Sequence, residues 1–403
     1  MKARKAKLIM IIVLAIFVFF FSSDFGLIDV EKTSIITAIA IDKDENNQYK
    51  VTAQIAVPEA TDTNSENLKA QIQGKGSTVG GALKDLGDLS GWFPKLSFCN
   101  LIIIGNDLSS DNVIKVLDYF AKTLRVQDSA LVALAEDKAA DLLSLATPLD
   151  NISAFALQKI MLKNIGFDRD IATADVKSFC AGHYSSSGSA FMPIIKAENA
   201  GTKPDGGNAD SGNSSTGGSS GGGSSSSGDK DNLFNAKTTA LFKDGKKVGE
   251  LDDSLTLTFN AITGLFKGST FPVDGIDENS EKSNYLLTVI SSTPRLKVVA
   301  TKDDITLYIK LKLYCKVSDH SADASEEALS QNIPLPNSVI LKAEEFFKNN
   351  IEELISTEKQ TGCDFLRIKE KLYRHNFKQY SRYKDNYLSV LKTDIKVDIS
   401  GQK

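Results

Sequence analysis

The sequence has few of the residues that build metal and redox centres. Its 403 residues include four cysteines and three histidines. Cys99, Cys180, Cys315 and Cys363 lie far apart, so no pair has the C-x-x-C spacing of a zinc site or a thioredoxin-type motif. We expect four separate, buried thiols. Neither H-E-x-x-H nor G-x-S-x-G is present, and we predict no catalytic, cofactor-binding or metal-binding residue and no cofactor.

An excess of charge is also missing. The net charge is only -4, with acidic and basic residues nearly balanced, which gives no electrostatic case for binding nucleic acid. The segment Tyr373–Tyr387 interleaves aromatic and basic residues and could contact anionic lipid or nucleic acid. We favour a loop whose aromatic side chains fold onto a sheet, and we predict no nucleic-acid partner.

Long apolar runs are absent except for Leu8–Phe21. Basic residues precede this run, a pattern that keeps the N-terminus in the cytoplasm and places the rest of the chain outside the membrane. As a helix, residues 8–23 span roughly 24 Å, which is short but sufficient with local bilayer thinning. The first cysteine is Cys99, so lipidation after the run is excluded. We favour an uncleaved anchor over residues 1–24, in contact with lipid through residues 8–23, over a cleaved signal peptide.

The region after the anchor reads as alternating strands and helices. Thr33–Ile41 is β-branched and apolar, and Tyr49–Val57 alternates apolar and polar residues, so the two predict an antiparallel hairpin. Further segments predict an α/β region over residues 30–200: strands at Ala70–Gly74, Leu96–Gly105, Ala130–Ala135 and Ser189–Ala197, and helices after Ser77 or Thr78, after Ser110 or Asp111, at Asp137–Ala146 and after Asn151.

Two segments in this region partly match ligand-binding motifs. Asp42, Asp44 and Asn46 fit the first positions of an EF-hand loop, but Asn47 and Ala53 replace its required Gly and Glu, so we favour a simple turn.

The second segment is Gly74-Lys75-Gly76 before a predicted helix, where backbone N–H groups could cradle phosphate. The full phosphate-loop motif is absent, and a capped helix explains the segment with fewer assumptions.

Composition changes sharply at residues 205–228, which are mostly glycine and serine. Such a segment buries too little apolar surface to offset the entropy of ordering. Residues 201–231 therefore form either a flexible interdomain linker or an expanded loop between strands at Phe191–Ile195 and Thr238–Phe242. We favour the loop, because both flanks read as strands and a long insertion costs little.

Residues 232–403 predict a second α+β region. Asp244–Gly245 suits the tight turn of a hairpin, and Ile305–Cys315 alternates like a strand of an antiparallel sheet with one solvated face. The predicted elements are a helix from Ser254 to Ile262 ended by Gly264, strands from Tyr285 to Val317, helices at Ser338–Gln360 and Asp364–Arg374, and a closing strand at Ile395–Ile399. The fold class is thus α+β and multi-domain, with mixed and antiparallel sheets, packed helices and one N-terminal transmembrane or signal helix.

Several of these segments, in this order, resemble the Ger(x)C family, the C subunits of spore nutrient-germinant receptors. The similar segments are Ile36–Val57, Gly74–Leu86, Asn100–Phe120, Thr239–Leu251 and Glu353–Arg374. The chain departs from the family in lacking a lipidated cysteine, in having no tryptophan in its tail, and in its Ser/Gly insertion.

The resemblance implies a non-enzymatic receptor subunit on the outer face of the spore inner membrane. It would act in receptor assembly and signalling beside integral-membrane A and B subunits. The alternative is a membrane-tethered extracytoplasmic protein that binds a small ligand itself, which requires a concave pocket with convergent polar groups.

Overall fold

The computed structural model describes residues 10–14, 17, 33–56, 69–123, 126–145, 147, 150, 152–162, 170–199, 232–264, 266, 268–276, 282–321 and 335–401. Of the predicted anchor helix, only residues 10–14 and 17 fall within these ranges, and they are helical. Within the described ranges, no helix has the length and apolarity needed to cross a membrane. The predicted Ser/Gly loop, residues 201–231, lies outside the described residues.

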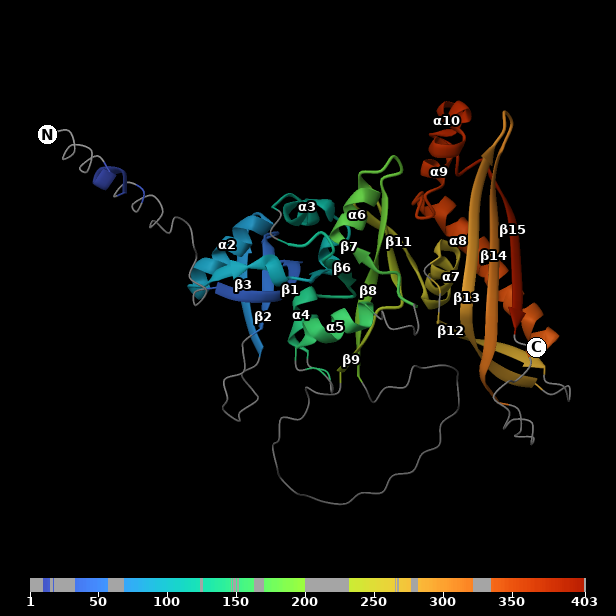
Figure 1. Cartoon of the computed structure of the whole chain (residues 1–403), viewed down its shortest axis with the longest axis horizontal. Coiled ribbons are helices and arrows are strands. Elements are labelled where there is room, and N and C mark those ends of the chain that lie inside the picture. Colours follow the sequence, from blue (N-terminus) through green and yellow to red (C-terminus); the bar gives the residue numbers. More distant parts are fainter. Residues whose placement is uncertain are drawn as a thin grey trace, which may run out of the picture.

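A large mixed sheet organises the first part of the chain (Figure 1). Its strand order is β11-β10-β8-β6-β5-β1-β2-β3, with β1, β5, β6 and β8 parallel and the outer strands antiparallel. The main strands are β1 Thr33–Lys43, β2 Tyr49–Ala56, β3 Lys69–Gly76, β5 Leu101–Ile104, β6 Leu131–Ala135, β8 Ser189–Asn199, β10 Thr239–Lys243 and β11 Lys246–Leu251. Three short strands pair beside them: β4 Phe93–Lys95, β7 Ala174–Asp175 and β9 Asn232–Asn235.

Helices cover both faces of this sheet. Their apolar residues form two separate cores, as expected for a parallel centre whose strands are apolar on both sides. One face carries α2 Val79–Ser90, α3 Ile114–Thr123 and α6 Val176–His183; the other carries α4 Ala139–Ser144 and α5 Ser153–Met161. Two 3₁₀ turns, η3 Leu96–Phe98 and η4 Asn106–Leu108, flank β5.

The second sheet lies at the other end of the molecule (Figure 1). Its order is β12-β13-β14-β15, antiparallel except for the β14–β15 pair, which is parallel. Buried and exposed residues alternate along most of β14, which confirms the predicted single solvated face. The elements of this part are α7 Asp253–Thr263, β12 Thr270–Ile276, β13 Lys282–Ala300, β14 Ile305–His320, α8 Asn337–Thr361, α9 Ile368–His375, α10 Phe377–Tyr383 and β15 Leu391–Gly401.

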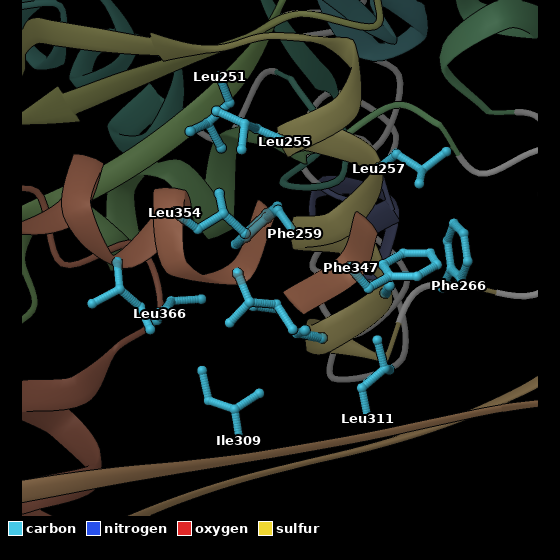
Figure 2. Close-up of a cluster of buried hydrophobic side chains, with 14 of the residues drawn as sticks. Leu251, Leu255, Leu257, Phe259, Phe266, Ile309, Leu311, Phe347, Leu354 and Leu366 are labelled. Carbon is cyan, nitrogen blue, oxygen red and sulfur yellow. The ribbon is translucent and has the colours of Figure 1, made fainter. Parts of the chain in front are cut away.

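The helices α7 and α8 join the two sheets. Their apolar residues share one core with β10 and β11 on one side and with β12–β15 on the other. Figure 2 shows this core: Leu251 and Leu255 lie at the first sheet's side, Phe347 and Phe266 in the middle, and Ile309 on β14. The two sheets are therefore connected by a continuous apolar layer.

Both predicted hairpins are confirmed. β1 and β2 pair antiparallel across the turn at Asp44–Gln48, and β10 and β11 pair across Asp244–Gly245, both of which have positive φ. β8 and β9 also pair antiparallel, with Asn199 opposite Asn232. The segment between these two residues thus connects neighbouring strands of one sheet.

Several predicted helix starts are wrong by one or two residues. Asn112, rather than Ser110 or Asp111, accepts the N–H of Ile114 at the start of α3. Asp252, rather than Ser254, caps α7 by accepting the N–H of Leu255. In each case a nearby polar side chain has the geometry to cap.

Asn151, the predicted cap of the next helix, lies outside the described residues. The helix itself, α5, differs from the prediction in its buried face. α5 follows Ile152, with no side-chain cap, and its buried stripe includes Leu157 rather than the predicted Phe155 and Ile160.

Three predicted strand and helix boundaries are also wrong. The predicted strand Leu96–Gly105 is a 3₁₀ turn followed by β5, because Cys99 N–H bonds back to the Leu96 carbonyl. The expectation of several strands from Tyr285 to Val317 is corrected to two, because β13 continues through Pro294, where β12 no longer pairs with it and one side of the strand can accept a proline. The helix predicted from Asp364 begins four residues later, at Ile368.

Two glycines allow α2 to lie directly on β3. A Cβ at Gly74 would lie 2.3 Å from the carbonyl oxygen of Ala82 and 2.5 Å from the N atom of Leu86, and one at Gly76 would lie 2.5 Å from the N atom of Ala82. Thr78 caps α2 by accepting the N–H of Gly81. The glycine pair thus serves close helix–strand packing.

We expect Gly74→Ala to lower the free energy of unfolding by about 1–3 kcal/mol, because the added methyl group must push α2 away from β3. Urea unfolding of the detergent-solubilised chain, followed by circular dichroism, measures this. Lys75→Ala is the control: its exposed side chain lies between the two glycines, and its loss should cost less than about 0.5 kcal/mol. Equal effects of the two substitutions would contradict the packing role.

Candidate functional site at the junction of the two sheets

The last turn of α8 places a carboxylate inside the junction between the sheets. Glu358 lies one turn after Leu354 on the buried face of the helix and is fully buried. Its Oε1 accepts the N–H of Leu366 at 3.0 Å, while its Oε2 has no hydrogen-bond donor among the described residues. A buried carboxylate with a free oxygen is costly unless it carries a proton.

A second carboxylate follows immediately. Gly362 ends α8 in the left-handed conformation and turns the chain. Asp364, also buried, then accepts the N–H groups of Ile368 at 2.6 Å and Lys369 at 2.8 Å, so it caps the start of α9. Its negative charge lies close enough to Glu358 to act on that carboxyl group.

The carboxyl pair has an unusual electrostatic setting. Burial, and next the charge of Asp364, raise the pKa of Glu358 well above its ordinary value. Burial, and next the charge of Asp364, raise the pKa of Tyr387. Lys371, half-buried, donates to the Leu366 carbonyl, and burial lowers its pKa. Glu358 therefore keeps its proton to a higher pH than an exposed glutamate does.

The same segment binds the first sheet. The N–H of Asp364 donates to Ser189 Oγ on β8 at 2.9 Å, and Cys363 Sγ donates to the Phe242 carbonyl on β10 at 3.2 Å. The ring of Phe365 packs edge-on against Phe259 of α7. Residues 363–366 thus link β8 and β10 to α7, α8 and α9, and the carboxyl pair lies inside this link.

The thiols play no chemical part at the junction. All four cysteines are buried and unpaired, as predicted. Burial raises the pKa of Cys363 to about 12, so the reactive thiolate is negligible near neutral pH.

The residues that partly matched an EF-hand have structural roles. Asp42 leaves the turn and caps α4, accepting the N–H groups of Ala139 at 2.7 Å and Ala140 at 3.0 Å. Asp44 accepts the N–H groups of Asn46 and Gln48 within its own turn, both at 2.9 Å. The two carboxylates therefore do not converge, which agrees with the turn interpretation.

Most of the segment Tyr373–Tyr387 is helical, in α9 and α10, so the prediction of a loop is wrong except for residues 384–387, which form turns. Tyr383 and Tyr387 do fold toward the sheet, and the Tyr383 hydroxyl donates to the Lys302 carbonyl at 3.0 Å. Tyr373 and Phe377 are exposed, at 51% and 65%, and their rings contact each other. The expected packing on the sheet is thus correct for the second half of the segment only.

Sequence reasoning missed Glu358 as a site residue. The one available signal was its spacing, because Phe347, Ile351, Leu354 and Glu358 continue the buried stripe of α8. A carboxylate in such a stripe indicates a buried, protonated or paired acid. Since neither Glu358 nor Asp364 is exposed, the pair acts on the fold rather than on a substrate.

We expect Glu358→Gln to remove a pH dependence of stability. Above pH 4.5 the unfolded chain releases the Glu358 proton while the folded chain keeps it, so the free energy of unfolding falls as the pH rises toward the raised folded-state pKa, by up to about 1.4 kcal/mol per pH unit. The glutamine amide does not titrate in this range and lacks this loss. Wild type should therefore lose stability relative to the variant as the pH rises above 4.5.

Urea unfolding at a series of pH values tests this. Glu352→Gln is the control, because Glu352 is exposed on the same helix, and its curve should run parallel to that of wild type. A Glu358→Gln curve that also runs parallel to wild type would contradict the raised pKa of Glu358.

Comparisons with known proteins identify the family. A model of the spore germination protein N-terminal domain matches residues 27–197, and a model described as spore germination B3/GerAC like, C-terminal, matches residues 237–401. No curated protein matches significantly. Among solved structures, the crystal structure of the GerBC protein is similar at 17% identity and a TM-score of 0.46, covering 93% of this chain and 99% of that chain.

The two family matches follow each other in the order that the sequence resemblance predicts, and they include both sheets and the carboxyl pair. They confirm the resemblance to the Ger(x)C proteins. The chain therefore belongs to the GerAC-like family of spore germination proteins, the C subunits of germinant receptors.

Proposed function

We propose that this chain is a membrane-anchored, non-enzymatic subunit of a spore nutrient-germinant receptor, and that it acts in receptor assembly and signalling. The observation that carries the proposal is that both parts of the family pattern lie on one chain. They are joined by the buried layer of α7 and α8. Such a body offers partners fixed surfaces, which suits docking.

The proposed partners are the integral-membrane A and B subunits of the receptor, and the proposed location is the outer face of the spore inner membrane. The apolar run Leu8–Phe21, with its basic flank, supports this topology. A membrane tether confines the subunit to the plane in which its partners lie. Weak lateral contacts then suffice for assembly, because the effective concentration is high.

We expect assembly to depend on the anchor. A variant that begins at Asp24 behind a cleavable signal peptide should lose co-isolation with the other subunits and germinate poorly in response to nutrient. The matched control replaces Leu8–Phe21 with a different uncharged apolar helix of the same length, and it should keep both. Crosslinking in spore membranes identifies the neighbours, and full germination from the Asp24 variant would contradict the proposal.

One observation favours the second candidate, a tethered small-ligand-binding protein. A polar cleft of about 480 Å³ lies between the β1–β2 turn and α4, and groups of both charge signs line it, among them Asp44, Lys50, Lys75 and Lys138. Such a cleft suits a small zwitterion or polar nutrient better than an apolar one.

Calorimetry of the purified full chain against amino acids, sugars and nucleosides tests this candidate. Micromolar binding that is lost in Lys50→Ala would support ligand binding by this subunit. For the docking function we expect no heat of binding from the isolated chain.

A further inference from the structure

An exposed apolar patch lies at β4 and the start of β1, the first strand after the N-terminal segment. Ile35, Trp92, Phe93 and Phe98 form this aromatic patch, and they are between 37% and 51% exposed. Exposed aromatic side chains that gather on one surface indicate contact with an apolar partner.

The local structure fixes these side chains together. β4 pairs in parallel with the start of β1, so that Phe93 lies opposite Thr33 and Lys95 opposite Ile35. Phe93 and Lys95 are two residues apart on one strand and share a face. The Lys95 ammonium lies 5.9 Å from the centre of the Phe98 ring. The patch is thus part of the sheet, not a loose loop.

A hollow of about 560 Å³ adjoins the patch. Trp92 and Phe93 line it together with Gly80, Gly87 and Tyr119. Gly80 and Gly87 lie two turns apart on α2, and their lack of side chains lets the Tyr119 ring and Pro94 pack directly on the helix at the wall of the hollow. The surface therefore has both exposed rings and space into which an acyl chain or ring can settle.

The position of the patch points to its partner. Thr33, at the start of β1, is the register partner of Phe93, and residues 22–32 reach at most about 40 Å when fully extended. The patch is therefore held close to whatever contains the apolar run Leu8–Phe21. Tryptophan and other aromatic residues are enriched at the level of lipid headgroups, where one end of the ring is apolar and the other is wet.

We propose that the aromatic patch inserts into the headgroup region of the bilayer and sets how the body stands on the membrane; this inference rests on the proposed anchoring function. Trp92 and its neighbours contact lipid, and Lys95 extends toward the headgroups. The second sheet, at the opposite end of the molecule in Figure 1, then lies away from the bilayer. Phe377, which is exposed on α10 beside that sheet, then has no lipid contact.

The chain contains a single tryptophan, so Trp92 is its own reporter. The full chain is reconstituted in phosphatidylcholine vesicles whose acyl chains carry bromine near the headgroup. We expect brominated lipid to quench Trp92 fluorescence relative to unbrominated lipid. In both kinds of vesicle we expect a blue-shifted emission of Trp92 and protection from aqueous acrylamide. Phe98→Ser, and more strongly Phe93→Ser with Phe98→Ser, should reduce the quenching. Phe377→Ser, an equally drastic change at the far end, should leave it unchanged.

The outcomes separate this inference from the anchoring proposal. Vesicle flotation reports anchoring independently of Trp92. A chain that floats with vesicles, but whose Trp92 is open to acrylamide and unaffected by brominated lipid, keeps the anchor and overturns the lipid-facing patch. Protection of Trp92 that arises only in the presence of other receptor subunits assigns the patch to a protein partner and also overturns it. A chain that does not float with vesicles overturns both proposals.

Discussion

The burial of two acidic side chains, Glu358 and Asp364, is the constraint on which the joining of the two sheets depends. A charged Glu358 would lie beside Asp364 between apolar layers, and burial together with that neighbouring charge favours its protonated form. Asp364 caps α9, and its own N–H donates to Ser189 on the first sheet. The short segment after Gly362 thus connects α8, α9 and β8.

Much of the fold could be predicted from periodicity, because local sequence encodes local structure. The alternation in β14, the stripe of α8 and the Asp244–Gly245 turn each predicted the observed element. Other features depend on distant contacts that no local pattern records. β12 contains Pro272 and Gly275 and does not read as a strand, yet it pairs along its whole length with β13. The parallel direction of β15 likewise follows from where α8–α10 return the chain, not from its own residues.

The candidate site was less predictable than the fold, since burial rather than residue type defines it. A glutamate on α8 is ordinary in sequence, and only the packing of two sheets on opposite sides of that helix removes Glu358 from water. The glycines of β3 show the reverse case. Gly74 and Gly76 stood out in sequence as a possible phosphate cradle, but their role is to let α2 approach. A glycine motif at a helix start can therefore be assigned a ligand only after its packing against neighbouring elements is known.

The position of the Ser/Gly insertion shows why such an addition leaves the fold intact. Asn199 and Asn232 are register partners at the end of the β8–β9 pair. The insertion therefore begins and ends at adjacent positions of the same sheet. Closing a connection of roughly 30 residues instead of four costs about 2 kcal/mol in loop entropy. The ladder between β8 and β9, and that between β8 and β10, are unaffected. Because β8 also supplies Ser189 to the junction, an insertion at its far end is separated from the carboxyl pair by the full length of the strand.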